Sequence, residues 1–417
     1  MYAAPDGYIS EKEIKAALEA ELAPVKESLK KVLLLPPDYT RLHSRAGLIS
    51  ACLYEMLRDT CEVDVLPALG THVAMTEAEC ADMFRGAIPY EKLIVHDWRN
   101  EVVKIGEVPR EFVKEVSEGC VDEAITVEVN RRIMDSSYDM IFSIGQVVPH
   151  EVVGMANRNK NIFVGCGGSA MINASHKLGA FYGLERLMGH DHSPVRKVFD
   201  YAEEHFLSDA PITYILTVCR AEGVCGLFMG RARRHFEKAV KLSQELNLEF
   251  VDEPLKKVVV YLDPSEFKST WLGNKSIYRT RMAIADGGEL IVLAPAVSRF
   301  GEDAECDRLI RKYGYCGREK VLELCRDHED LRGNMSAAAH MIHGSSDGRF
   351  HITYCPGGLT KEETEQACFG YMPYEEAARR YDPAKLKDGF NTLPDGEEIY
   401  YISNPALGLW ADRRKFV

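Results

Sequence analysis

Short apolar runs alternate with amphipathic stretches along most of this chain, and this alternation restricts its fold more than any other feature. Runs that fit buried strands lie at residues 31–38, 62–69, 93–98, 140–148, 161–164, 212–218 and 258–262. Helices are predicted at 46–59 and after Ser10 and Thr76, where Glu13 and Glu79 complete capping boxes. Strands joined through helices form βαβ units, so the sequence predicts an α/β fold with mainly parallel sheets flanked by helices.

A second series of alternating elements begins after residue 252. A predicted helix at 231–246 leads into Asp252-Glu253-Pro254, and the elements expected beyond it are a strand at 256–263, a helix at 275–286, and strands at 289–294 and 350–354 with helices between them. A chain of 417 residues is long enough for more than one core. We therefore predict two α/β domains, residues 1–252 and 253–417, with the active site in the cleft between them.

The net charge of −13 argues against a nucleic-acid or anionic-membrane partner, because such surfaces recruit clustered lysine and arginine. No apolar run approaches the roughly 18 residues of a membrane span. The first residues lack the charged and apolar regions of a signal peptide. The chain is expected to be cytoplasmic and to act on a small molecule.

The twelve cysteines contain no Cys-x-x-Cys pair, so neither a zinc ribbon nor a disulfide scaffold is indicated. We interpret them as reduced, buried thiols. Cys166, flanked by glycines, is also interpreted as a core residue.

Polar residues follow three of the predicted strands directly. Asp38-Tyr39-Thr40-Arg41 comes after the first strand, Gly70-Thr71-His72 after the second, and His150 after the run at 140–148. Ligands of parallel α/β sheets bind outside the carboxyl ends of the strands. We therefore expect one crevice to collect these side chains.

Two further residues continue this series: Lys160, ten residues after His150, and His176, twenty-six residues after it. Taken in order and with these separations, the motifs resemble the nickel-pincer-nucleotide lactate racemase superfamily of 2-hydroxyacid racemases and epimerases. The resemblance is greatest to the branch that epimerises the aldonates gluconate and mannonate at C2. It implies an isomerase that inverts C2 of a 2-hydroxy acid.

Inversion at C2 by proton removal is difficult, because a carbanion beside a carboxylate is poorly stabilised. Removing the hydrogen as hydride gives a planar 2-oxo acid instead, but it requires an acceptor that no side chain supplies. A base must also take the hydroxyl proton, on either side of the substrate, and histidine suits this task. The resemblance assigns these two catalytic roles to His72 and His150.

The hydride acceptor implied by the resemblance is nickel held in a pyridinium-3,5-bisthiocarboxylic acid mononucleotide, which other enzymes synthesise. Imidazole is a suitable nickel ligand. His176 matches the family's metal ligand, and Lys160 matches the lysine that tethers the cofactor as a thioamide. Asp38, Thr40 and Asn157 are predicted at the cofactor, whose phosphate needs backbone N–H groups or a cation.

Arg41 matches the arginine that binds the substrate carboxylate, with Asp38 predicted to orient it. Lys275, twelve residues before Gly287-Gly288, is a second candidate cation. Trp271 stands where the lactate enzymes have tyrosine, and His43 completes the predicted substrate contacts.

The chain departs from the lactate enzymes before the tethering lysine. Those enzymes have Gly-Phe-Ser-Gly-Gly-x-Lys, whereas this sequence reads Gly154-Met-Ala-Asn-Arg-Asn-Lys160. Extra donors and acceptors here, at Asn157, Arg158 and Asn159, and at His43 and Ser44 in the arginine motif would suit a substrate with several hydroxyls. This favours a sugar acid over lactate.

Other readings stay open at this point. The substrate can be lactate or another short 2-hydroxy acid. A zinc-dependent hydrolase or lyase would use His72, His150 and His176 as three ligands of one ion. A sugar-acid-binding protein would keep the fold without turnover. His96 is interpreted either as a residue that lines the pocket or as one that packs beside Trp98, and no metal site is expected at the pair His340 and His343.

Overall fold

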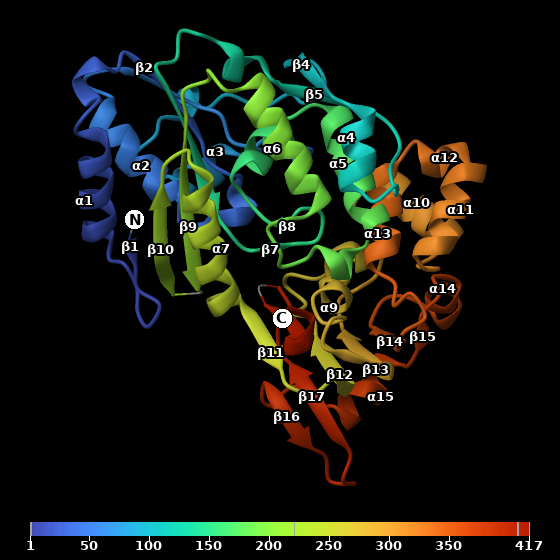
Figure 1. The fold of residues 1–417 in the computed structure, drawn as a ribbon. Coiled ribbons are helices and arrows are strands. Elements are labelled where there is room, and N and C mark those ends of the chain that lie inside the picture. Colours follow the sequence, from blue (N-terminus) through green and yellow to red (C-terminus); the bar gives the residue numbers. More distant parts are fainter. Residues whose placement is uncertain (1, 221, 407, 417) are drawn as a thin grey trace. The chain divides into compact units, whose positions relative to one another are not determined.

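The computed structural model describes residues 2–220, 222–406 and 408–416, which form two compact units (Figure 1). The first unit contains residues up to 182 together with 186–247. The second contains residues 183–185 and those from 248 onward. Both are built from parallel-rich sheets flanked by helices, as the sequence predicted. The domain boundary between residues 252 and 253 stays a prediction.

The sheet of the first unit has the strand order β1-β10-β9-β6-β2-β3. Its parallel core pairs β2 with β3 and β6, and β6 with β9. Antiparallel strands complete one edge, where β10 pairs with β9 and β1 pairs with β10. The bounds are β1 Tyr2–Ala3, β2 Lys31–Leu35, β3 Glu62–Val65, β6 Met140–Gln146, β9 Ile212–Arg220 and β10 Gly223–Met229.

Alternate residues of β2 enter two different cores. Val32 and Leu34 pack in a cluster with residues of α1 (Glu11–Leu22), α2 (Ala46–Leu57) and α3 (Glu77–Met83). Leu33 and Leu35 pack with α5 (Ser169–Tyr182), α6 (Pro194–Phe206) and α7 (Arg233–Asn247). Each fully buried leucine contributes roughly 1.5–3 kcal/mol. The continuous apolar run is therefore explained by a strand covered on both faces.

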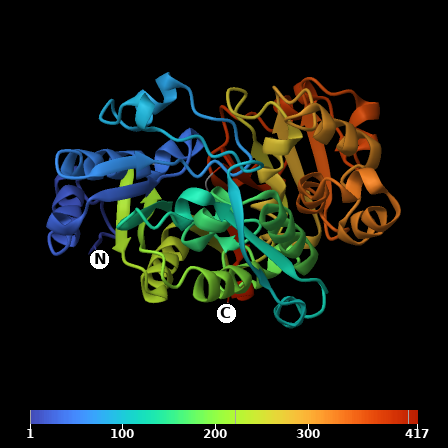
Figure 2. The ribbon, with the colours of Figure 1, turned by 90° about the horizontal axis from the view of Figure 1, so that it is seen from above.

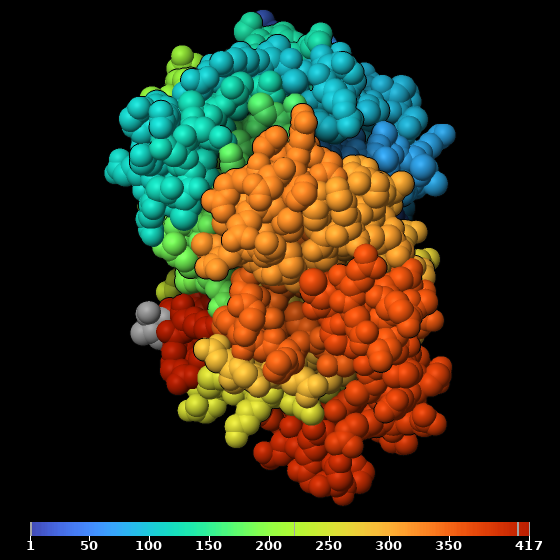
Figure 3. All heavy atoms as spheres, turned by 90° about the vertical axis from the view of Figure 1, so that its right-hand side faces the viewer, coloured from blue at the N-terminus to red at the C-terminus, as the bar shows by residue number. Residues whose placement is uncertain are grey.

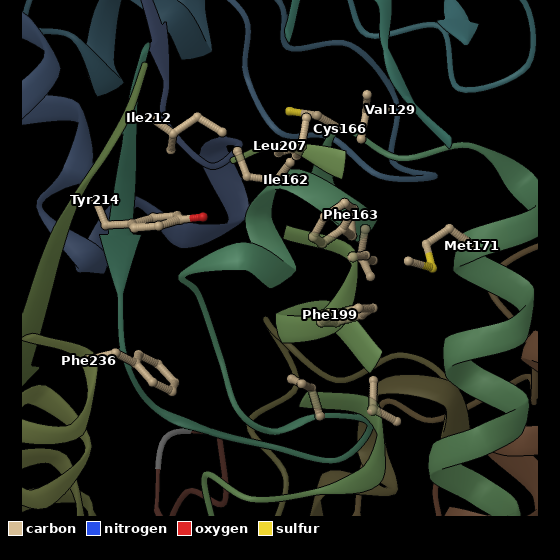
Figure 4. Packing of buried hydrophobic residues seen from close by; sticks show 14 of the residues in the cluster. Val129, Ile162, Phe163, Cys166, Met171, Phe199, Leu207, Ile212, Tyr214 and Phe236 are labelled. Carbon is tan, nitrogen blue, oxygen red and sulfur yellow. The ribbon is translucent and has the colours of Figure 1, made fainter. Parts of the chain in front are cut away.

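Figure 4 shows part of the second of these cores. Cys166 lies in it among Val129, Ile162 and other apolar side chains, with no exposed surface. Burial raises the pKa of its thiol to about 12. The prediction of a core cysteine is confirmed.

A hairpin of β4 (Val102–Val108) and β5 (Ile125–Asn130), drawn as a long cyan ribbon in Figure 2, lies beside helices of the first unit. Its connection carries α4 (Arg110–Val116). The hairpin contacts α5 and α6. The short strands β7 (Pro149–His150) and β8 (Gly154–Met155) pair with each other just after β6.

The sheet of the second unit has the order β15-β14-β13-β12-β17-β16 and is parallel except for β16. Helices α10 to α13 pack against one another, and the residues around them form the orange surface in Figure 3. The strands are β11 Leu248–Val251, β12 Leu255–Tyr261, β13 Ile284–Ala294, β14 His351–Pro356, β15 Gly370–Tyr371, β16 Gly389–Thr392, β17 Glu398–Ile402 and β18 Leu409–Asp412. The helices are α8 Thr270–Gly273, α9 Lys275–Tyr278, α10 Ala304–Tyr313, α11 Arg318–Asp327, α12 Glu329–Arg332, α13 Met335–His343, α14 Lys361–Gln366 and α15 Tyr374–Arg380.

Three predicted elements are wrong. Residues 161–164 form a π-helical turn, Asn161–Gly165, instead of a strand. Residues 93–98 are an irregular segment in which Leu93 makes an isolated bridge to Val65. The predicted helix 275–286 stops at Tyr278, and β13 begins at Ile284. Short apolar runs fit a buried strand or a buried turn equally well, which explains the first two errors.

In the part of the chain that the structure describes, helices are too short or too polar to cross a membrane.

Candidate active site

The strand order brings the predicted motifs to one edge of the first sheet. Strands β3 and β6 lie on opposite sides of β2. The order in which strands are added to the sheet therefore reverses at β2. Such a reversal leaves a crevice at the carboxyl ends of the strands, where α/β proteins bind ligands. Asp38 follows β2, His72 follows β3, and His150 follows β6.

Asp38 and His72 form a dyad at this edge. The Nδ1–H group of His72 donates a hydrogen bond to Asp38 Oδ2 at 2.6 Å. The other carboxylate oxygen accepts hydrogen bonds from the Thr40 amide, at 2.8 Å, and from the Thr40 hydroxyl. This bonding pattern leaves the lone pair of His72 Nε2 outward, as a general base requires.

Burial alone would raise the pKa of Asp38, but the hydrogen bonds from His72 and Thr40 outweigh it and lower that pKa. The carboxylate therefore stays ionised beside His72, where it would stabilise an imidazolium if the ring accepted a proton. The His72 side chain is 51% exposed.

Arg41 lies in the short 3₁₀ helix Tyr39–Ser44. Its Nη1 donates to the Thr40 hydroxyl at 3.1 Å, and its guanidinium is otherwise exposed. The sequence interpretation paired Asp38 with Arg41 directly. The structure instead places Thr40 between them, so Asp38 orients His72 and Thr40, and Thr40 contacts the arginine.

His150 has the opposite tautomer. Its Nδ1 accepts a hydrogen bond from the Val152 amide at 3.1 Å, so the neutral ring carries its proton on Nε2. Burial, together with the positive charges of Lys160 and Arg41, lowers the pKa of His150 to about 3. For His150 to present a lone pair at Nε2, the ring proton would have to move to Nδ1. That Nδ1–H group would then need an acceptor, and the nearby carboxylate is that of Glu151, 3.7 Å from Nδ1.

Lys160 lies near the same groups. Burial lowers the pKa of its ammonium to about 8. The positive charge of Arg41 also lowers this pKa, whereas the carboxylates of Glu151 and Asp38 raise it. A lysine with a lowered pKa has more neutral amine at physiological pH and is a better nucleophile. Glu151 was missed by the sequence analysis, although it adjoins His150.

The chain before Lys160 makes a left-handed bend without glycine. Asn157 and Arg158 have φ values of +66° and +55°. A left-handed residue with a side chain costs about 1–2 kcal/mol, and asparagine tolerates it best. Asn157 Oδ1 accepts the Arg158 amide at 2.6 Å. The Asn157 side chain also occupies the space next to Gly145, where an added Cβ would lie 2.1 Å from Nδ2.

Polar side chains at this bend turn into the protein. Arg158 Nη1 bonds Asp200 at 2.6 Å and lies 3.1 Å from Glu203, and the Asn159 amide donates to the same two carboxylates. Arg196, which is fully buried, donates to Met155 O and Asn157 O and to the Asn159 side chain. The structure therefore does not support the expectation that Arg158 and Asn159 face substrate hydroxyls.

Arg196 and Asp200 were also missed by the sequence analysis. Both lie on α6, and Arg196 falls on its apolar face between Val195 and Val198. A charged residue on the apolar face of a helix is unusual, and this pattern could have pointed to Arg196 in the sequence. Ser44, a further expected donor, is buried and its hydroxyl accepts the Ala46 amide.

His176 lies on α5 and is suited to bind a metal. Its Nδ1–H donates to Ile172 O at 2.7 Å, which leaves the Nε2 lone pair as the ligand atom. Burial lowers the pKa of the imidazole, so the ring stays neutral. A hydrogen bond from the other ring nitrogen to a backbone carbonyl is the usual arrangement around metal-binding histidines.

The turn before α5 is held by His96, whose Nε2 donates to Gly167 O at 3.0 Å while its Nδ1 accepts from Asn130. His96 therefore has a structural role here, whereas the sequence had left lining of the pocket equally open. Across residues 2–220, 222–406 and 408–416 no group of three or more His, Cys, Asp or Glu side chains is arranged to hold a metal ion. The three-histidine zinc site considered from the sequence is not formed.

The remaining predicted residues have the following positions. His43 is half-buried in the 3₁₀ helix of Arg41. In the second unit, Trp271 stacks on His340 with ring centroids 4.1 Å apart, and His340 Nε2 donates to Trp271 O. Lys275 Nζ lies 3.6 Å from Glu266.

Comparison with known families bears directly on the first unit. Residues 6–186 match the profile of the lactate racemase N-terminal domain. This segment contains Asp38, His72, His150, Lys160 and His176, so the superfamily resemblance drawn from these residues is supported there. No curated protein matches the chain.

Two solved structures resemble the chain along nearly its whole length. A crystal structure of a protein from Thermotoga maritima has a TM-score of 0.79 and 26% identity, with 98% of this chain and 99% of that chain covered. The lactate racemase apoprotein from Thermoanaerobacterium thermosaccharolyticum has a TM-score of 0.73 and 16% identity, with 96% and 92% covered. The chain thus has a lactate racemase-like N-terminal domain and the lactate racemase fold, which supports an isomerase-type enzyme.

Proposed function

We propose that the protein is a racemase or epimerase that inverts C2 of a 2-hydroxy acid, with a nickel-pincer nucleotide as cofactor. The substrate class proposed first is the sugar acids, with interconversion of D-gluconate and D-mannonate as the reaction to test. The chemical class follows from the lactate racemase-like domain. The sugar acid rests on the resemblance to the aldonate branch and on His43.

The observation that carries the proposal is the set of nitrogen atoms presented near one sheet edge. His72 offers an Nε2 lone pair backed by a carboxylate, His176 offers an Nε2 lone pair backed by a carbonyl, and Lys160 offers a buried amine. The proposed reaction needs three groups from the protein: a base, a metal ligand and a covalent anchor for the cofactor.

The donor set fits the cofactor. His176 would ligate nickel and Lys160 would anchor the pincer, while the Asp38–Thr40 segment and the Asn157 bend would lie beside it. When bound, the nickel-pincer nucleotide supplies a centre that accepts the C2 hydrogen as hydride and returns it. A metal that takes a single protein ligand needs no cluster of ligating side chains.

The other steps belong to side chains of the chain itself. Arg41 binds the substrate carboxylate with parallel hydrogen bonds. His72 takes the hydroxyl proton at Nε2, and Asp38 stabilises the resulting imidazolium. His150 faces the reaction as a neutral Nε2–H donor in its resting tautomer, and acts as the second base after its ring proton moves to Nδ1, next to Glu151.

A short 2-hydroxy acid such as lactate is the second candidate, and one observation favours it. Three of the extra polar side chains expected to bind substrate hydroxyls, Arg158, Asn159 and Ser44, are bonded inside the protein. Their loss as substrate contacts weakens the argument for a polyhydroxylated substrate.

The test is to co-express the protein with the pincer-synthesis enzymes, measure nickel and intact mass, and incubate it with gluconate or lactate in deuterated water. We expect bound nickel, an adduct on Lys160, and product that keeps protium at C2. Protein with neither nickel nor adduct would refute the cofactor. Deuterium at C2 would refute hydride transfer, and turnover of lactate alone would decide for the second candidate.

A further inference from the structure

The bend at Asn157 and Arg158 determines where Lys160 lies, because only Asn159 separates the bend from the lysine. Two consecutive left-handed residues with side chains are unfavourable in isolation. The conformation therefore has to be maintained by contacts from elsewhere in the fold.

Those contacts come from one face of α6. Arg196 binds the peptide oxygens of Met155 and Asn157, one before the bend and one within it. Asp200 binds the side chain of Arg158, the second residue of the bend, and that of Asn159, which follows it. The bend is thus held through its backbone on one side and through its side chains on the other.

The buried positive charge of Arg158 requires the carboxylates of α6. Its side chain is only 9% exposed, so its guanidinium needs nearby carboxylates, which Asp200 and Glu203 supply. Asp200 also pairs with Arg233 of α7, which in turn contacts Glu237 at 3.3 Å. Removing the Asp200 charge would leave Arg158 with Glu203 alone.

We propose that Arg196, Asp200 and Glu203 are positioning residues for Lys160, acting through the Asn157–Arg158 bend. The role in cofactor anchoring rests on the proposed function, whereas the role in holding the bend does not. Arg158 is the link: its buried cation couples the left-handed backbone to the carboxylates of α6. Replacing Arg158 by glycine removes the cation and the backbone strain at position 158, so the bend should then depend much less on Asp200.

A double-mutant cycle tests this dependence. Asp200→Asn, Arg158→Gly and the double variant are compared with the unaltered protein, and Glu237→Gln serves as a control that removes a carboxylate from the outer end of the same network. Hydrogen exchange of the 154–162 segment in the apoprotein reports the bend. Intact mass of co-expressed protein reports the Lys160 adduct.

In the unaltered background, we expect Asp200→Asn to speed exchange of this segment about tenfold and to lower the adduct to a similar degree. In the Arg158→Gly background, the same change should alter both by less than about twofold. Glu237→Gln should alter neither. Equal effects in both backgrounds would show a general loss of stability and would overturn the proposal, as would no effect in either.

Should Asp200→Asn fail to fold, Glu203→Gln is put through the same cycle with the same criterion. An absence of nickel and adduct in the unaltered protein would count against the proposed function, and the exchange cycle would still decide whether α6 holds the bend.

Discussion

The two sides of the candidate site are built differently. His72 lies on an exposed loop in which Val73 is 87% exposed. Its imidazole ring is held by a hydrogen bond to the side chain of Asp38. The bend before Lys160 is buried, with Asn159 fully enclosed and bonded to α6. A base that exchanges its proton with solvent gains from exposure, whereas an anchor must be fixed. Under the proposed function, the exposed side would handle protons and the enclosed side would hold the cofactor.

Replacing His176 by alanine tests the cofactor-holding side most severely. We expect nickel in co-expressed protein to fall to background, because the lone pair held by the bond to Ile172 O is lost. His205→Ala is the matched control, since His205 makes the same bond to Tyr201 O at 2.9 Å on α6 but lies exposed. Normal nickel content in His176→Ala would remove this residue from the proposed ligands.

Asp38→Asn tests the proton-handling side. Turnover should fall by about 10²–10⁴-fold, because the amide neither fixes the His72 tautomer nor stabilises its imidazolium. Nickel content should stay normal, which would separate the two sides experimentally. Tyr39→Phe is the control, since the Tyr39 hydroxyl bonds Asp82 at 2.7 Å and leaves the dyad alone. Equal losses of nickel and turnover in Asp38→Asn would break the comparison.

The Lys160 amine provides a pH test of the enclosed side. Burial disfavours its charged form and lowers the pKa of Lys160 to about 8, so the neutral amine predominates only above that pH. Acylation of Lys160 in the apoprotein, followed by peptide mass spectrometry, should rise with a midpoint near pH 8. At pH 7 its neutral fraction should exceed that of an ordinary lysine on the order of a hundredfold.

The positive charge of Arg41 contributes to that lowered pKa, so Arg41→Gln should move the midpoint of acylation to higher pH. A midpoint near that of surface lysines in the unaltered protein would show that the amine is solvated, contrary to the enclosed arrangement.

Gly145→Ala should have the smallest effect. The new methyl group would lie 2.1 Å from the Asn157 side-chain nitrogen, so Asn157 would have to move. We expect a loss of about 1–3 kcal/mol in the free energy of unfolding, measured with urea. Gly7→Ala, with nothing within 4 Å of its added Cβ, should leave that free energy unchanged. Equal stabilities of the two variants would show that the bend adapts freely.

Several features were predictable because their causes are local in sequence. The capping boxes at Ser10 and Thr76 form as expected, since each joins residues three positions apart. The buried strand at 31–35 follows from its uninterrupted apolar run. The run at 161–164 was misread because an apolar stretch of that length does not reveal its hydrogen bonds. In the structure, Asn161 ties this turn to Leu35 O and Ser143.

By itself the sequence determined the α/β architecture and the identities of the residues that gather at the carboxyl ends of β2, β3 and β6. Only the tertiary structure decided which ring nitrogen His72 presents and that the side chains of Arg158 and Asn159 turn inward. The physical reason is separation along the chain. The partners that fix these orientations, Asp38 for His72 and Asp200 for Arg158, lie 34 and 42 positions away. No local pattern encodes such contacts, which form when packed strands and helices bring distant residues together.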